Sequence, residues 1–454
     1  MNTFKTAVWV SAFGLAMAAA PSWAAVPAAE AAKLGAALTP MGAEKAGNAD
    51  GSIPAWAPLP KNAGAVDAKG FLADPYGSEK PLFVIDAKNV DKYASKLSPG
   101  QVAMIKRYPE TYRLPVYPGH RGATVPDAVF AAIKDNATQT KLVGDGNSLE
   151  NFKTAVPFPI PQSGLEVVWN HITRYRGGAV SRTVTQATPQ QNGDYSLVYF
   201  QDSFVFRDRM KDYDPNNPGN ILFYFKQEVT APARLAGTVL LVHETLDQVK
   251  EPRSAWIYNA GQRRVRKAPQ VAYDGPGTAA DGMRTSDNLD LYNGAPDRYD
   301  WKLVGKQEMY IPANSYKLDS PSLKYAEIIK PGHINQDLTR YELRRVWHVV
   351  ATLKPGAKHI YAKRDFYFDE DTWQVAEVDH YDSRGQLWRV AEAHAQDYYN
   401  YQVPWTTLET LYDLTNGRYL ALGMKNEEKR AFKFDYSASS SDYSPNALRQ
   451  EGIR

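Results

Sequence analysis

Histidine and acidic residues are the side chains of this sequence that could do acid–base or metal chemistry, and their spacing supports neither. His243-Glu244-Thr245-Leu246-Asp247 begins like the His-Glu-x-x-His helix of zinc proteases, but Asp247 stands where the second histidine ligand would be. His380 and His394 lie on successive expected strands, and such a pair without a third ligand more often makes ordinary hydrogen bonds. The sequence has no Gly-x-Ser-x-Gly elbow and no phosphate-binding loop. We therefore expect no catalytic group, no metal site and no cofactor.

A basic run is the second chemically distinctive feature. Arg263, Arg264 and Arg266 follow a strand-like segment, and their guanidinium groups offer planar forks of donors that suit an anionic head group or a docking partner. The alternative is a solvated strand face with acidic partners on the neighbouring strand. Residues 273–294 follow as a long polar loop without a regular period, which predicts a functional flap or lid. The three arginines of the basic run, together with Arg284 in this loop, are the predicted head-group or partner contacts.

Large aromatic side chains recur along the expected strands. The chain contains 28 Tyr, 10 Trp and 16 Phe, and in segments such as 221–226 one strand face is fully apolar while the other is half apolar. Strands covered on both faces fit a sheet that packs on helices and encloses an apolar cavity. A filled core with Tyr and Trp at its rim is the alternative. The residues predicted to form the cavity wall or rim are Trp256, Tyr258, Phe204, Phe206, Phe223, Phe225 and Trp347.

Composition and the first residues predict where the protein works. The 454 residues include no cysteine, which excludes disulfides and thiol chemistry, and the net charge of +3 is too small to indicate nucleic-acid binding. Residues 1–24 read as a signal peptide cleaved after Ala24, so the mature protein is expected in the periplasm. An outer-membrane barrel is disfavoured, because the strand-like segment 340–347 carries charges on both faces.

The expected secondary structure changes along the chain from helices and loops to strands. Residues 25–162 are expected to form a helical and loop-rich wrap or lid, with helices beginning at the capping box of Ser98 and at Pro126. Residues 163–400 have a period near two and predict an antiparallel barrel domain, whose first strand would be Leu165–Tyr175. Residues 401–454 are expected to complete the barrel with a hairpin and tail. About ten long strands must close or wrap around something to bury their apolar face.

Four stretches together carry a family resemblance: 34–40 with 47–54, 256–266, 284–287 and 361–382. In this combination the chain resembles the domain of unknown function 1329 family of periplasmic proteins, often labelled outer-membrane lipoprotein-sorting-like. Its central part is also similar to the LolA/LolB carriers. The resemblance implies a mainly β (α+β) fold, a half-open antiparallel β-barrel with covering helices and an N-terminal wrap.

The same resemblance implies a carrier or chaperone for a hydrophobic ligand: a lipid, an acyl chain or lipoprotein-like cargo. It also implies partners, an RND-type inner-membrane exporter and an outer-membrane β-barrel. Two other functions remain open. One is a secreted hydrolase with a site built from scattered histidines and carboxylates, and the other is an envelope adaptor that binds only protein.

Overall fold

One large curved sheet dominates the computed structural model, which describes residues 25–269 and 271–451. The predicted signal peptide lies outside the described residues. A 15-stranded sheet runs in the order β1-β2-β12-β13-β14-β15-β16-β17-β5-β6-β7-β8-β9-β10, with β11 paired to β12. Its strands are β1 (Phe83–Ile85), β2 (Leu114–Val116), β5 (Ala179–Ala187), β6 (Leu197–Phe206), β7 (Ile221–Ala231), β8 (Val239–Thr245), β9 (Ser254–Asn259), β10 (Arg264–Lys267), β11 (Tyr299–Pro312), β12 (Tyr341–Leu353), β13 (Lys363–Asp369), β14 (Val375–Tyr381), β15 (Leu387–Tyr398), β16 (Val403–Asp413) and β17 (Tyr419–Met424).

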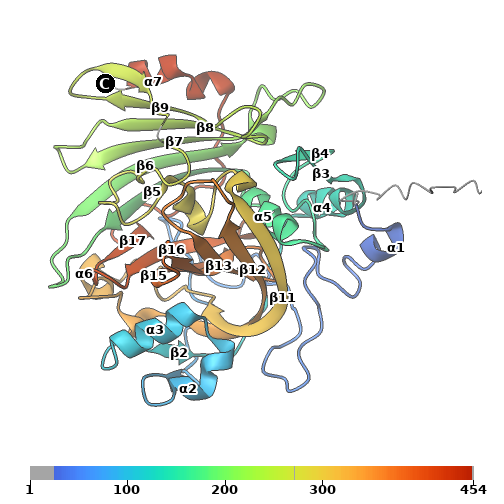
Figure 1. Ribbon diagram of the computed structural model, residues 1–454, viewed down its shortest axis with the longest axis vertical. Coiled ribbons are helices and arrows are strands. Elements are labelled where there is room, and N and C mark those ends of the chain that lie inside the picture. Colours follow the sequence, from blue (N-terminus) through green and yellow to red (C-terminus); the bar gives the residue numbers. More distant parts are fainter. Residues whose placement is uncertain (1–24, 270, 452–454) are drawn as a thin grey trace, which may run out of the picture.

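The sheet bends into an open trough and does not close. In Figure 1 strands β5 to β9 form its upper part and β11 to β16 its lower part. Neighbouring strands are antiparallel except at the contact of β2 with β12, and in the described residues no ladder joins β10 to the strands at the far end. This confirms the predicted mainly β fold and its half-open form. The other elements are α1 (Ala28–Ala31), α2 (Val90–Tyr93), α3 (Pro99–Arg107), α4 (Asp127–Gln139), α5 (Gly164–Thr173), α6 (Tyr325–Ile328), α7 (Pro445–Glu451) and the hairpin of β3 (Lys141–Val143) and β4 (Ser148–Glu150).

The inner face of the trough is filled first by helix α5, where the sequence had predicted a strand over Leu165–Tyr175. That prediction is wrong. Ser163 caps the helix by accepting a hydrogen bond from the backbone N–H of Glu166 at 3.3 Å. Val168 and Ile172 are buried in the same core as the inner-face phenylalanines of β6 and β7. A helix that is apolar on nearly every side cannot be told from a strand by periodicity.

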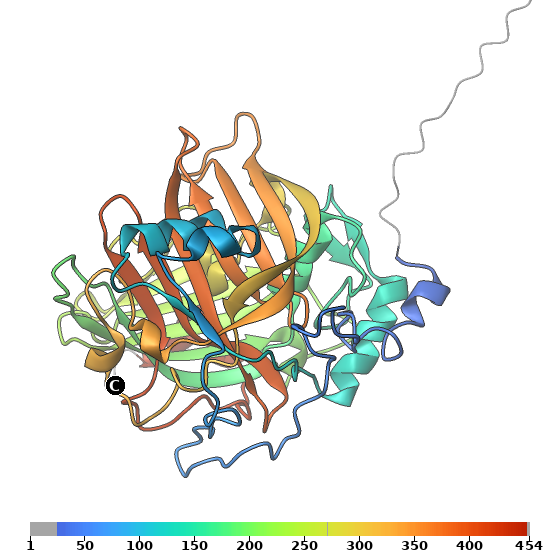
Figure 2. The same cartoon turned by 90° about the horizontal axis from the view of Figure 1, so that it is seen from below.

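Helices α3 and α7 cover the outer face, whereas Val129 and Ile133 of α4 belong to the inner core. Helix α3 begins with the predicted capping box, in which Ser98 and Gln101 bond each other's backbone N–H groups. Figure 2 shows α3 lying across the strands of the lower part of the sheet, and it contacts β14 and β15. Helix α4 begins directly after Pro126, as predicted. Helix α7 near the C-terminus packs on β8, β9 and β10. Among the described residues, no helix is long and apolar enough to cross a bilayer.

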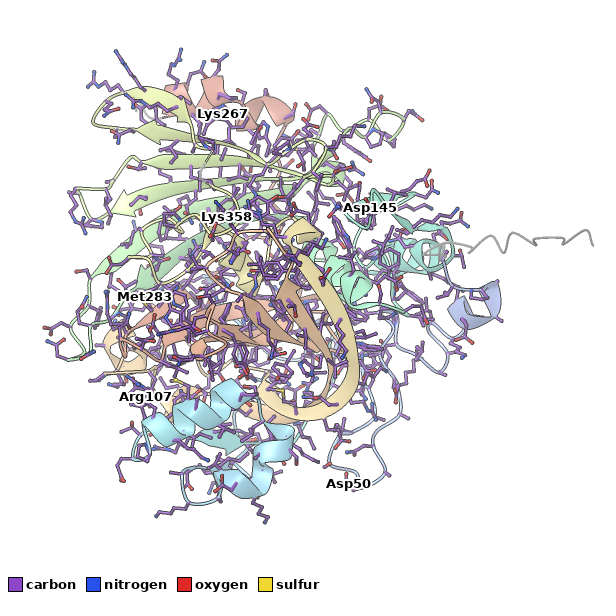
Figure 3. All side chains as sticks on the ribbon, in the orientation of Figure 1. Asp50, Arg107, Asp145, Lys267, Met283 and Lys358 are labelled. Carbon is purple, nitrogen blue, oxygen red and sulfur yellow. The ribbon has the colours of Figure 1, made fainter. Side chains whose placement is uncertain are left out.

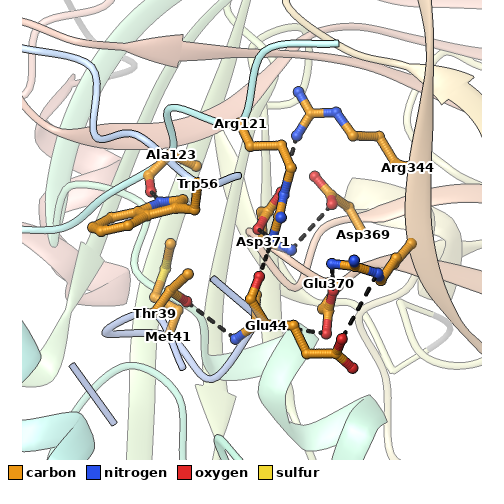
Figure 4. Close-up of polar contacts among 12 residues, drawn as sticks. Thr39, Met41, Glu44, Trp56, Arg121, Ala123, Arg344, Asp369, Glu370 and Asp371 are labelled. Atoms are coloured by element: carbon orange, nitrogen blue, oxygen red, sulfur yellow. Dashed lines mark hydrogen bonds and ion pairs between the residues drawn. The ribbon is translucent and has the colours of Figure 1, made fainter. Parts of the chain in front are cut away.

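The N-terminal segment is tied to the sheet through buried charges at the turn between β13 and β14 (Figure 4). Arg121 forms a two-pronged ion pair with Asp371, at 2.9 and 2.8 Å, and Arg344 of β12 bonds the same carboxylate at 3.0 Å. Arg121 also donates to the carbonyls of Ala46 and Pro54 at 3.2 and 3.1 Å. Burial alone would raise the pKa of Asp371, but the hydrogen bonds and charge of Arg121, with the charge of Arg344, outweigh it and lower that pKa.

Candidate functional site

An apolar wall on the inner face of β7 and β8 forms the base of the candidate site. Phe225 pairs with Val242 across the two antiparallel strands, and because alternate residues share a face, Phe223 and Leu240 point the same way. These four side chains are buried and line a pocket. Phe204 on β6 continues the wall, with its ring centroid 4.5 Å from that of Phe223. The wall is therefore a contiguous aromatic and aliphatic surface.

The pocket is covered by an irregular segment, residues 271–285, which we call the flap. Its side chains and backbone at Val271, Pro276, Gly277, Thr278 and Arg284 form the opposite wall of the pocket. Its tip is exposed at residues 281–282, whereas Met283, labelled in Figure 3, is buried. The flap contains no helix or strand, so isolated backbone hydrogen bonds at its base and side-chain contacts from other elements hold it in place.

Three side chains from the sheet region hold the tip of the flap. Gln186 of β5 donates to the carbonyls of residues 279 and 278 at 2.6 and 3.4 Å. Arg389 of β15 donates to the carbonyls of residues 283 and 282 at 3.1 and 3.0 Å. Arg418 forms an ion pair with Asp281 at 2.6 Å, on the exposed side. The base of the flap is bound more firmly, because the backbone N–H groups of residues 286 and 287 donate to the carbonyls of residues 275 and 273, and the Tyr273 hydroxyl donates to Asp297 at 3.1 Å. The tip, residues 278–283, depends on the few side-chain contacts above, which is the property expected of a segment that can open locally.

The chain after the flap is anchored far more firmly. Residues Ser286–Leu291 form a 3₁₀ segment in which Asp287 meets Arg364 at 3.0 Å and His359 at 3.1 Å. Asp290 meets Arg174 and Arg176. Burial would raise the pKa of both aspartates, but the neighbouring arginines outweigh burial and lower both values. The flap thus ends in a fixed, fully buried charge network.

Polar groups lie at one end of the pocket. Glu244 of β8 is neutralised by Arg253 at 2.7 Å and accepts a hydrogen bond from Asn293 at 2.9 Å. Gln227 and Arg284 line the pocket nearby. Arg284 is only 6% exposed, and burial lowers its pKa. The site therefore combines a large apolar wall with a small set of convergent polar groups, which is the usual composition of a small-molecule site.

The free space is divided by the flap. The pocket beneath it offers only about 50 Å³ to the centres of water-sized molecules. A second hollow, between the ends of β5 to β8 and the flap tip, offers about 550 Å³, and Thr278 lines both. In its present position the flap therefore occupies much of the space in front of the apolar wall.

Comparison with known proteins places the chain in a family. The model of the family described as Protein of unknown function (DUF1329) matches residues 84–449. The chain belongs to the DUF1329 family. It is 73% identical over 455 residues to the "Uncharacterized protein PA3922" of Pseudomonas aeruginosa PAO1, covering all of both chains.

Two solved structures are similar to it at lower identity. A DUF1329 family protein from Desulfovibrio piger is 14% identical with a TM-score of 0.38, over 60% of this chain and 92% of that one. The LolA superfamily protein NE2245 from Nitrosomonas europaea is 11% identical with a TM-score of 0.36, over 60% of this chain and 93% of that one.

The structure of this DUF1329 chain brings only some of the predicted site residues together. Phe223, Phe225 and Arg284 line the pocket, and Phe204 and Phe206 extend its apolar wall on β6. Sequence reasoning missed the aliphatic partners Leu240 and Val242 on β8 and the flap contacts Gln186 and Arg389. The strand period of 239–245 could have indicated the aliphatic pair, whereas nothing local in the sequence indicates the flap contacts.

The remaining predicted residues lie elsewhere. Trp256 and Tyr258 sit on the outer face of β9, in the cluster that also contains Leu448 of α7, so the pocket does not include them. Trp347 of β12 stacks on Trp373, with ring centroids 6.2 Å apart. The arginine run forms the β9–β10 hairpin at the edge of the sheet, where Arg263, Arg264 and Arg266 are exposed. Their role as partner contacts stays a prediction.

A histidine paired with a carboxylate and with its other ring nitrogen free would favour the hydrolase alternative. His359 contacts Asp287 through Nε2, but its Nδ1 accepts the backbone N–H of Tyr361 at 3.0 Å, so both ring nitrogens are engaged. His243 Nε2 donates to the carbonyl of Tyr443 at 2.7 Å on the outer face, while Glu244 faces inward. Among the described residues, no group of three or more histidine or acidic side chains is arranged to hold a metal ion.

Proposed function

We infer that this protein is a periplasmic carrier that holds a hydrophobic molecule against the inner face of β7 and β8, beneath the flap. The observation that carries the proposal is the apolar wall of Phe223, Phe225, Leu240 and Val242. It is covered by a segment without regular structure rather than by a packed helix or strand. Apolar walls covered by weakly held segments are suited to uptake and release, because little folded structure must be disrupted to expose them.

The energetics favour an acyl chain or a molecule of similar shape. Burying a CH₂ group gains about 0.8 kcal/mol, so about ten methylenes supply binding in the micromolar range before the cost of ordering the chain and moving the flap. The hollow of about 550 Å³ adjoins the covered pocket, since Thr278 borders both. When the flap withdraws, the two spaces form one groove along the inner face.

Transfer without chemistry is the activity that this arrangement supports. The polar groups of the pocket are the Glu244–Arg253 ion pair, two amides, one further arginine and the hydroxyls of Thr278 and Ser286. Among the described residues neither hydroxyl is hydrogen-bonded to a side chain that could act as its base, so no nucleophile–base pair is formed. A carrier of this kind would receive cargo from an RND-type exporter and hand it to an outer-membrane β-barrel. In that role the exposed arginines of the β9–β10 hairpin are the proposed docking contact, at the free edge of the sheet.

Native mass spectrometry of the protein purified from periplasm tests the proposal. We expect a co-purified lipid or acyl molecule, extractable into organic solvent, and binding of a fluorescent fatty-acid analogue at micromolar concentration. If the protein carries no such molecule and the analogue does not bind, the carrier function is refuted and the adaptor alternative gains support.

A further inference from the structure

Arg284 is the exception among the buried cations of the inner region. The other buried arginines each pair with a carboxylate: Arg121 with Asp371, Arg174 and Arg176 with Asp290, Arg340 and Arg344 with Glu342, Arg364 with Asp287, and Arg389 with Asp413. Arg284 forms no ion pair or side-chain hydrogen bond within residues 25–269 and 271–451, and its Nε is buried without a partner. A buried charge left unpaired costs several kcal/mol, so folded chains pair such charges or use them.

This unpaired guanidinium belongs to the pocket. Arg284 lines it together with the apolar residues of β7 and β8. The side chain lies across Gly277 of the flap, where a Cβ atom would come within 2.7 Å of Arg284 Cγ. The backbone N–H of Gly277 donates to the Arg284 carbonyl at 3.0 Å, which fixes the two sides of the flap together. The glycine therefore gives the arginine room to lie along the flap, facing the apolar wall.

Nearby carboxylates act on Arg284 only through space. Glu409 of β16 is the strongest of them, followed by Asp202, yet neither forms an ion pair with Arg284. Asp202 is already paired with Arg182 at 3.2 Å. Burial raises the pKa of Glu409 to about 7, so this group does not supply a full compensating charge at neutral pH. The protein's own residues thus leave the positive charge of Arg284 incompletely balanced.

We propose that the ligand of this pocket is an anionic amphiphile, whose carboxylate or phosphate monoester pairs with Arg284 while its tail lies on the apolar wall of β7 and β8. The inference rests on the proposed carrier function and names its ligand class. A guanidinium presents two parallel N–H donors to such an anion. Because Arg284 belongs to the flap, the same ion pair would draw the flap onto the bound molecule and couple occupancy to closure.

The test compares three probes with one tail length: dodecanoate, dodecyl phosphate and uncharged methyl dodecanoate. Their dissociation constants are measured by calorimetry or by displacement of a fluorescent analogue. The wild-type protein is expected to bind at least one anionic probe tenfold or more tightly than the ester. Whether the carboxylate or the phosphate binds more tightly identifies the head group. Arg284→Gln should remove that preference and Arg284→Lys should retain part of it, whereas Arg430→Gln, at an exposed arginine outside the pocket and the β9–β10 hairpin, should behave as wild type.

The possible results distinguish the assignment of Arg284 from the carrier function on which it rests. If the wild-type protein binds all three probes equally, or if Arg284→Gln keeps the full preference for the anion, the assignment of Arg284 is overturned while the carrier function stands. If none of the probes binds at micromolar concentration, the carrier function itself fails. The comparison of the three probes on wild-type protein requires no variant and decides the ligand class even if a substitution prevents folding.

Discussion

The open state of the flap should become more populated when the contact of its tip with Gln186 of β5 is removed. Gln186 is 1% exposed and donates its side-chain N–H to the flap carbonyl of residue 279 at 2.6 Å. The substitution Gln186→Leu keeps a side chain of similar size and abolishes this donor. The contacts of Arg389 and Arg418 to the flap tip remain, so the flap is loosened rather than released.

The size of the effect follows from the hydrogen bond that the substitution removes. A hydrogen bond of this kind contributes about 1 kcal/mol net, and the longer bond of Gln186 to the carbonyl of residue 278, which is lost as well, adds to this. Since 1.4 kcal/mol corresponds to a factor of ten, the population of the open flap should rise about five- to tenfold.

Amide hydrogen exchange measures this directly. The N–H groups of Gly277 and Met283 donate within the flap, to the carbonyls of residues 284 and 280, and should exchange about five- to tenfold faster in Gln186→Leu. Amides of β13 to β15 should be unchanged. Gln162→Leu is the matched control, since the exposed Gln162 donates to one backbone carbonyl outside the flap. Unchanged exchange in the flap, or a change spread over the whole sheet, would show that the flap does not open separately.

Three further predictions concern buried charges. Arg284→Met should raise the melting temperature of the ligand-free protein by about 1–3 °C in calorimetry, because the substitution removes an unpaired buried charge. For a chain of this length the melting temperature shifts by about 1 °C per kcal/mol. A fall in the melting temperature would contradict the unpaired state of Arg284. Arg121→Met should cost about 3 kcal/mol of unfolding free energy in urea, because Asp371 keeps only Arg344; a loss within error would refute that anchor. Burial, with the charge of Glu392, raises the pKa of Glu377, so its stabilising contribution is full below the unfolded pKa of about 4.5 and is lost as pH rises. The melting temperature should therefore fall as the pH rises above about 4.5, and less so in Glu377→Gln; an equal fall in both proteins would contradict this.

Local signals in the sequence predicted local structure well. The helix after Ser98 could be predicted because its capping residues are close neighbours in the chain. Helix α5 was missed although Ser163 and Glu166 carry a similar signal, because adjacent β-branched residues and nearly complete burial obscure the helical period. The wall formed by Phe223 and Phe225 was predicted from strand alternation, which depends only on neighbouring residues.

What the sequence could not decide was which face of each strand looks inward. Trp256 and Ile257 alternate on β9, and only the packing of α7, far later in the chain, makes the face of Trp256 the outer one. The importance of Arg284 was equally hidden. Its distinction is the lack of a paired carboxylate in a region where the other buried arginines have one, and such pairing joins residues up to 261 positions apart, as in Arg340 and Glu79.

Photo-cross-linking with a diazirine-bearing fatty acid both detects the ligand and locates its binding site. We expect adducts concentrated in peptides of β7, β8 and the flap, covering residues 221–245 and 271–285, and competed by unlabelled fatty acid. Adducts confined to the outer hollow lined by residues 65–77, or the absence of competable adducts, would contradict a carrier site on the inner face.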